Sequence, residues 1–166
     1  MLDKFMLTTV FVLVFIFNAS AELIHANHHN IVMDDIRLLM WQDDEDSKFV
    51  SMYFSTAKQY CDEKVLDGYS DWRLPSVNEL LYIVDRHRAV PAIFLVFKYG
   101  VRDSYWTSIL AEQNKVNTVS FEEGNIHISS TNEKKFVRCV RTANKNEIYK
   151  MRGIPTKGPF LNPTNF

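Results

Sequence analysis

The chain has 166 residues, of which 46% are hydrophobic and 13% aromatic, and its formal net charge is −1. This composition excludes a disordered or collagen-like chain, and the length suits one domain with a substantial core. The net charge conceals a basic end, because residues 134–166 carry eight lysines and arginines against Glu147 alone. A basic end can attract polyanions, and the alternative is a solvated surface with a cationic tail.

The N-terminus has the pattern of a secretory signal peptide. Lys4 precedes an uncharged apolar run of 13 residues (5–17), and Asn18-Ala19-Ser20-Ala21 follows as a small-x-small cleavage site. The alternative is a membrane anchor, but a spanning helix needs about 20 apolar residues. We therefore expect cleavage after Ala21, export to the periplasm or the medium, and no stable membrane span in the mature protein.

Residues 22–33 are interpreted as a polar leader that contains three histidines, His25, His28 and His29. Neutral imidazoles are common metal ligands, which leaves metal binding open. The cluster lacks cysteines and lies near a terminus, where order is usually poor. No metal site and no cofactor are predicted.

The first half of the domain is expected to hold one strand and two helices. Residues 37–42 read as a buried strand that the acidic run 43–46 stops. An apolar stripe with helical spacing follows, formed by Val50, Phe54, Ala57, Cys61 and Val65. The alternative is that this helix starts at Ser55, a possible N-cap, and that residues 49–53 are extended.

The second helix has a clearer start. Ser76 is followed three residues later by Glu79, which is the spacing of a capping box. Its expected apolar face consists of Val77, Leu80, Leu81 and Val84. Residues 87–103 show no regular pattern.

Short antiparallel strands are expected in the last half, at residues 105–108, 116–121, 126–128 and 136–141. Strand alternation is expected to turn Arg138 to the side opposite Cys139, and we expect Arg141 to lie with it on a cationic face away from the core. The alternative is that the acidic segment 43–46, or Glu122 and Glu123, neutralises this face within the fold. Residues 143–166 are interpreted as an extended tail containing prolines and glycines.

The two cysteines predict a disulfide. An even count after an export signal indicates that Cys61 and Cys139 are bonded, although two buried free thiols are the alternative. The bond would close a loop of about 80 residues, for which chain entropy predicts roughly 4–5 kcal/mol of stabilisation.

Four segments together resemble a known family. They are Leu39-Met40-Trp41-Gln42-Asp43, Ala57 with Tyr60-Cys61, the block 68–80 with Trp72-Arg73-Leu74-Pro75-Ser76, and Val137-Arg138-Cys139-Val140-Arg141. The sequence from Leu38 to Arg141 resembles the Lcl C-terminal domain family, named after Legionella collagen-like adhesins, and Phe54 stands where that family more often has tryptophan.

The resemblance implies an α+β fold of C-type-lectin-like plan over residues 34–142, with two helices packed on short antiparallel strands and one disulfide. It also implies a location outside the cytoplasm. The adhesin after which the family is named binds sulfated glycans. This chain lacks the Glu-Pro-Asn and Trp-Asn-Asp motifs of calcium-dependent lectins. A calcium-dependent sugar site is therefore not expected.

Catalysis is not predicted, because His87 and His127, the histidines within the domain, lie in no catalytic motif. We expect a non-enzymatic module that binds a polyanionic glycan, or alternatively a structural subunit of an envelope or secreted assembly that contacts an envelope protein. Nucleic acid is not an expected partner. Trp72 and Arg73 suit either a binding site or the scaffold, and Tyr105 and Trp106 are expected in the core. The candidate ligand-binding residues are Arg138, Arg141, Lys134, Lys135, Trp72 and Arg73.

Overall fold

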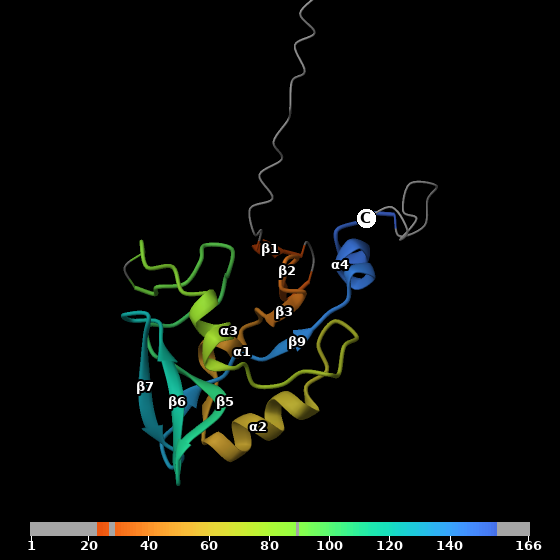
Figure 1. The fold of residues 1–166 in the computed structure, drawn as a ribbon. Coiled ribbons are helices and arrows are strands. Elements are labelled where there is room, and N and C mark those ends of the chain that lie inside the picture. The colour runs from red at the N-terminus through yellow and green to blue at the C-terminus, as the bar shows by residue number, and fades with distance from the viewer. Residues whose placement is uncertain (1–22, 27–28, 89, 156–166) are drawn as a thin grey trace, which may run out of the picture.

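The computed structural model describes residues 23–26, 29–88 and 90–155, which form two small sheets with four helices around them (Figure 1). The predicted signal peptide 1–21 with its cleavage site Ala21, the histidine His28 and the end of the predicted tail lie outside the described residues. The mixed architecture confirms the predicted α+β class, and a C-type-lectin-like plan is compatible with it.

The first sheet is antiparallel, in the order β1-β2-β3-β9. Its strands are β1 (Leu23–His25), β2 (Ile31–Asp34), β3 (Leu39–Gln42) and β9 (Val140–Thr142). Strand β3 confirms the predicted strand at 37–42 with a later start. All four residues of β2 are buried. The interpretation of 22–33 as a polar leader is therefore wrong at both ends, because residues 23–25 form β1 and the apolar Ile31, Val32 and Met33 form most of β2 in this sheet.

The second sheet has the order β4-β8-β5-β6-β7. It consists of β4 (Ser51–Met52), β5 (Ser104–Glu112), β6 (Lys115–Ser120), β7 (Asn125–Ser130) and β8 (Lys135–Phe136). The strands β5, β6 and β7 confirm three predicted strands, each extended at one or both ends. Strand β8 is parallel to β5 and antiparallel to β4.

Four helices surround the sheets: α1 (Asp46–Phe49), α2 (Phe54–Glu63), α3 (Val77–Tyr82) and α4 (Lys145–Met151). Helix α2 begins after the extended strand β4, as the alternative of a late start predicted, but its N-cap is Tyr53 and not Ser55, and Phe49 belongs to α1. The buried residues of α2 are Ala57 and Cys61. Val65 lies beyond its end and is 69% exposed, so its place in the apolar stripe was wrong.

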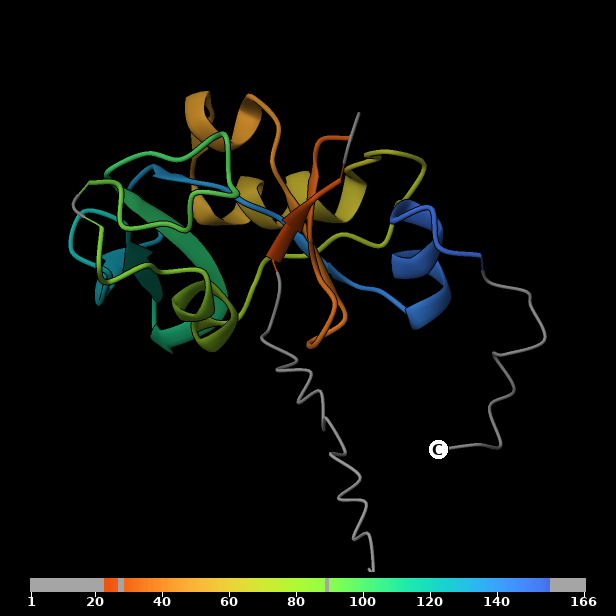
Figure 2. The ribbon, with the colours of Figure 1, turned by 90° about the horizontal axis from the view of Figure 1, so that it is seen from above.

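Helices α3 and α4 have capping boxes. Ser76 and Glu79 cap α3 reciprocally, which confirms the prediction for this helix. Asn144 and Glu147 cap α4 in the same way. The interpretation of 143–166 as an extended tail is wrong over α4, because the box starts a helix whose Ile148 is buried in the core. Both views place α4 far from the five-stranded sheet (Figures 1 and 2).

The core has two neighbouring parts. One surrounds the disulfide and contains Trp72 and Trp106, and the other contains Trp41, Tyr105 and Phe121. The bond between Cys61 of α2 and Cys139, just before β9, is present as predicted and joins residues 78 positions apart. It ties α2 to the junction of the two sheets. No helix among the described residues is both long and apolar enough to cross a bilayer.

Candidate functional site

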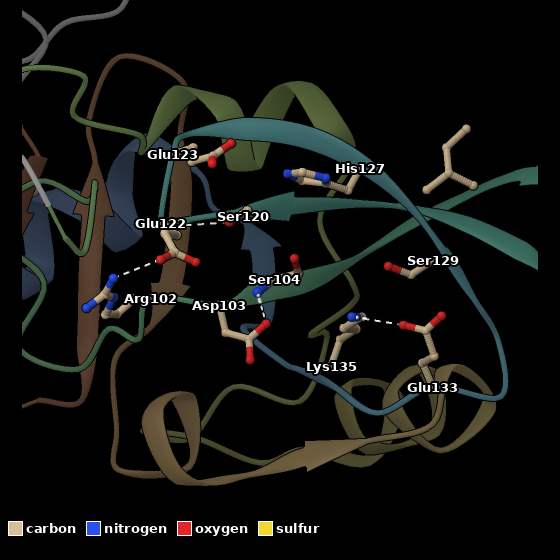
Figure 3. Close-up of a pocket in the computed structure, with 11 residues that line it drawn as sticks. Arg102, Asp103, Ser104, Ser120, Glu122, Glu123, His127, Ser129, Glu133 and Lys135 are labelled. Carbon is tan, nitrogen blue, oxygen red and sulfur yellow. Dashed lines mark hydrogen bonds and ion pairs between the residues drawn. The ribbon is translucent and has the colours of Figure 1, made fainter.

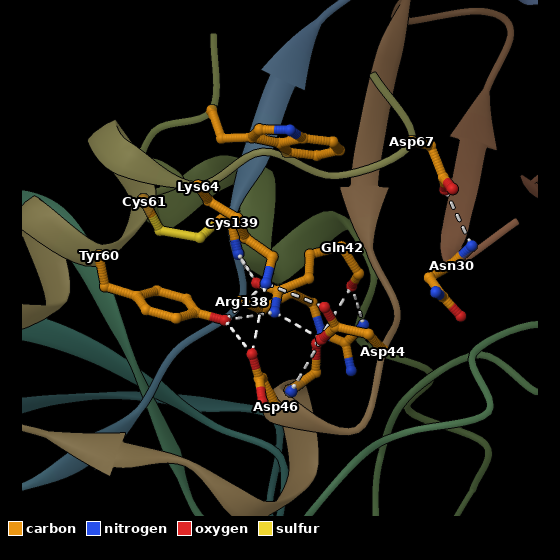
Figure 4. A network of polar contacts seen from close by, with 12 residues as sticks. Asn30, Gln42, Asp44, Asp46, Tyr60, Cys61, Lys64, Asp67, Arg138 and Cys139 are labelled. Carbon is orange, nitrogen blue, oxygen red and sulfur yellow. Dashed lines mark hydrogen bonds and ion pairs between the residues drawn. A yellow bond between two sulfur atoms is a disulfide. The ribbon is translucent and has the colours of Figure 1, made fainter. Parts of the chain in front are cut away.

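The side chain of Arg138 lies inside the protein (Figure 4). It has no exposed surface, and its guanidinium donates to a carboxylate oxygen of Asp43 at 3.0 Å and to the carbonyl oxygens of Gln42 and Tyr99. The expectation that Arg138 faces solvent is wrong. The alternative, neutralisation by the acidic segment 43–46, describes its environment.

Arg138 is buried because the chain passes from one sheet to the other at this point. The predicted strand 136–141 is two strands, β8 in one sheet and β9 in the other, with Val137, Arg138 and Cys139 between them. All three residues are buried, since the chain crosses the core here. Strand alternation assigns faces only within one continuous strand, and so it could not place Arg138.

Arg141 is also committed to the fold, with 4% of its surface exposed. Its guanidinium lies 2.6 Å from Asp71 and 3.1 Å from Glu147, and it covers the ring of Tyr69. Burial disfavours the charged guanidinium, but the bonds to both carboxylates outweigh it and raise the pKa of Arg141. The hydrogen bonds from Arg141 lower the pKa of Asp71. The expectation that Arg141 forms an open cationic face is therefore wrong.

Trp72 belongs to the scaffold. It is 2% exposed, and its indole N–H donates to the carbonyl of Tyr69 at 3.0 Å. The core reading of this residue is confirmed, as it is for Tyr105 and Trp106, both fully buried. The buried hydroxyl and indole N–H of these two donate to the carbonyls of Ser47 and Met52.

Arg73 is half-exposed and forms a bidentate ion pair with Glu79, the N3 residue of α3. The two guanidinium nitrogens donate to the two carboxylate oxygens at 2.7 and 2.9 Å. The hydrogen bonds that Arg73 donates to Glu79 raise the pKa of Arg73. Burial opposes ionisation of Glu79, but its bonds to Arg73 and to the backbone of Ser76 outweigh burial, so its pKa is lowered. Arg73 thus braces the helix start, with 42% of its side chain still facing solvent.

A polar network adjoins the disulfide (Figure 4). The hydroxyl of Tyr60 donates to Asp46 at 2.7 Å and accepts from Lys64, whose ammonium also lies 2.9 Å from Asp44. Burial raises the pKa of Tyr60 to about 12. The hydrogen bond with Lys64 lowers this pKa in part, and the hydrogen bond with Asp46 raises it. The network is internally satisfied, which is typical of a structural group.

Lys134, another predicted ligand-binding residue, borders an open aromatic hollow of about 600 Å³. The hollow is lined by Tyr53, Phe54, Ser55, Thr131 and Asn132. The ammonium of Lys134 lies 5.4 Å from the centroid of the Tyr53 ring, and Tyr53 is 48% exposed. The pairing of β4 with β8 creates this site, because it sets the residues after β4 beside the segment before β8.

Phe54 also lines a second hollow, of about 250 Å³, that is shared by Lys58 and Arg73. Its other lining residues are Asp62, Leu74, Ser108 and Leu110. We call the two hollows, together with Lys134 beside the Tyr53 ring, the Phe54 surface. Among the described residues Lys58 and Lys134 have no ion-pair partner, so the surface combines two available ammonium groups with an exposed ring, an amide and hydroxyls.

The structure thus divides the six predicted ligand-binding residues. Lys134 and Arg73 lie on the Phe54 surface, Arg138, Arg141 and Trp72 are buried, and Lys135 forms an ion pair with Glu133 at 2.9 Å. Sequence reasoning missed Tyr53, Lys58 and Asn132. The only hint of this site in the sequence was the pair of adjacent aromatic residues, Tyr53 and Phe54. Nothing in the sequence near them connects them to Asn132.

The histidines of the N-terminal segment have carboxylate neighbours. His25 lies 3.3 Å from Asp43, and His29 lies 3.4 Å from Asp67. In the part of the chain that the structure describes, no three histidine, cysteine, aspartate or glutamate side chains form a group that could hold a metal ion.

A family model described as the Lcl C-terminal domain matches residues 30–141. The match runs from the residue before β2 into β9, and it includes both cysteines and the whole Phe54 surface. No curated protein matches this chain.

Proposed function

We propose that this chain, which belongs to the Lcl C-terminal domain family, is an exported, non-enzymatic module that binds an anionic glycan through the Phe54 surface. The observation that carries the proposal is that Tyr53 and Asn132 line one open hollow while the ammonium of Lys134 lies 5.4 Å from the centroid of the Tyr53 ring. An aromatic ring offers a stacking face for a sugar ring, and amide and hydroxyl groups bond to sugar hydroxyls. The two ammonium groups suit the sulfates or carboxylates of the chain.

Two features support the remaining parts of the proposal. Both cysteines are held in the disulfide, so neither is available as a thiolate nucleophile. A disulfide of this kind persists in an oxidising compartment, which suits an exported protein. The alternative function, a structural subunit of an envelope or secreted assembly, draws on exposed apolar side chains such as Phe49, which is 68% exposed.

The test is retention of the mature protein on immobilised heparin. We expect the double variant Lys58→Ala, Lys134→Ala to elute at clearly lower salt than the parent, because fewer cations meet the polyanion. The matched control is Lys98→Ala, Lys115→Ala, which removes the same charge from exposed positions outside both hollows. It should elute later than the first double variant.

A second pair of variants separates stacking from charge. Tyr53→Phe keeps the ring and should retain binding, whereas Tyr53→Ala should weaken binding by roughly 0.5–1.5 kcal/mol, the scale of aromatic contacts. The proposal fails if both lysine pairs shift elution equally, or if the parent does not bind heparin at low salt. Binding to an envelope protein without heparin retention would favour the structural alternative.

A further inference from the structure

A third hollow, of about 420 Å³, lies on the five-stranded sheet and is lined mainly by polar and charged side chains (Figure 3). Ser104 of β5, Ser120 of β6 and Ser129 of β7 line it from three adjacent strands, and His127 lies beside them. Ser104 and Ser120 are partners in the ladder. Three hydroxyl groups from neighbouring strands therefore meet at one polar hollow, which shares no lining residue with the Phe54 surface.

Ser104 is the least satisfied of the three. It is 9% exposed, and its hydroxyl forms no hydrogen bond with any described residue while it points into the hollow (Figure 3). The Ser129 hydroxyl lies 3.1 Å from that of Thr118, and the Ser120 hydroxyl accepts from the backbone of Glu122. The Ser104 oxygen is not among the enclosed unsatisfied atoms of the described residues, so it is accessible from the hollow. It can therefore form a hydrogen bond with a ligand there in place of water.

The rim of the hollow is acidic. Glu122 is paired with Arg102 at 2.8 Å, and Glu133 with Lys135 at 2.9 Å. Asp103 and Glu123 also line the hollow, and neither has a cationic partner among the described residues. Both rim cations are thus neutralised while two carboxylates are left over. This charge repels a polyanion and attracts a cation.

We infer that this hollow binds a small polyhydroxylated organic cation, the class to which amino sugars belong, with its ammonium group toward Asp103 and Glu123 and its hydroxyl groups toward Ser104, Ser120 and Ser129. The volume lies in the usual range of small-molecule sites, about 300–1,000 Å³. A bare metal ion suits the site poorly, because no group of three metal-holding side chains exists in the described parts of the chain. The ligand of this hollow is a cation and that of the Phe54 surface an anion, and the two sites share no lining residue.

The test is a titration of the ¹⁵N-labelled mature protein with glucosamine, followed by NMR. Glucose, which has a hydroxyl group where glucosamine has the ammonium, is the matched control ligand. We expect saturable chemical-shift changes in the amide signals of β5, β6 and β7 with glucosamine. The affinity for glucose should be weaker by at least about tenfold, since a hydrogen bond to a charged group contributes about 1.5–3 kcal/mol.

Variants locate the effect. Ser104→Ala and Glu123→Gln should each weaken glucosamine binding several-fold, whereas Glu112→Gln, a carboxylate of the same sheet that does not line the hollow, should not. The Lys58→Ala, Lys134→Ala variant should bind glucosamine like the parent, so this inference and the proposed function fail separately. Equal binding of glucose and glucosamine, shifts spread over other acidic surfaces, or an unaffected Ser104→Ala variant with native spectra would overturn the inference.

Discussion

The guanidinium group of Arg138 lies 3.0 Å from a carboxylate oxygen of Asp43, and neither side chain has any exposed surface. The same carboxylate accepts backbone N–H bonds from Lys98 and Tyr99, at 2.8 and 3.2 Å. The pair therefore joins three distant parts of the chain: the end of β3, the irregular segment before β5, and the crossing between the two sheets. The role of this pair is therefore structural, because it fixes these three segments relative to one another.

Arg138→Ala should lower the free energy of unfolding by about 3–5 kcal/mol, because Asp43 is left buried without its cation. Urea denaturation of the protein measures this loss. Lys134→Ala, an exposed neighbour, is the control and should stay within about 0.5 kcal/mol of the parent. Adding Asp43→Asn to Arg138→Ala should recover part of the loss. Parent-like stability of Arg138→Ala would show that the buried pair is dispensable.

The disulfide should contribute mainly by restricting the unfolded chain. Replacing Cys61 and Cys139 together by alanine removes a link between residues 78 apart, and we expect a loss of about 4–5 kcal/mol from loop-closure entropy. Denaturant midpoints of the parent with and without reductant provide the same comparison without mutation. If reduction leaves the midpoint unchanged, the bond is not a major source of stability.

The capping box of α3 predicts a smaller effect. Ser76→Ala removes the side chain that accepts from the backbone N–H of Glu79, and should cost about 1 kcal/mol. Ser55→Ala is a matched control in the first turn of α2, where Tyr53 is the N-cap and no side chain caps the helix. Thermal unfolding of the two variants should therefore separate them. Equal losses would mean that serine contributes by something other than capping.

The ion pair between Arg73 and Glu79 predicts an acid-sensitive component of stability. The pKa of Glu79 is lowered in the folded protein, so the unfolded chain takes up its proton first as the pH falls. Stabilisation from Glu79 is complete above its unfolded pKa of about 4.3 and disappears as the pH falls through the lower folded value. Glu79→Gln should be less stable than the parent at pH 7.

The difference between Glu79→Gln and the parent should shrink on acidification, which urea midpoints between pH 7 and pH 3 would reveal. Glu112→Gln, an exposed partner of Lys115, serves as the control and should show little difference at any pH. A gap between Glu79→Gln and the parent that persists at pH 3 would attribute the effect to packing and not to charge.

Local patterns determined much of this protein from sequence alone. The spacing of Ser76 and Glu79 predicted the start of α3 because a capping box is made by residues three positions apart. The β5, β6 and β7 strands followed from alternation and turn residues in the same local way. The pairing of Cys61 with Cys139 needed no geometry, since a chain with two cysteines offers only one intramolecular disulfide.

Only the tertiary structure decided which side chains were available for binding. Arg138 and Arg141 looked like an open cationic face, but the chain changes sheets between β8 and β9, and distant acids, Asp43, Asp71 and Glu147, neutralise them. Tyr53 and Asn132 meet only because β4 pairs with β8. Burial and ion pairing depend on contacts between residues far apart in sequence, and periodicity within one segment carries no information about such contacts.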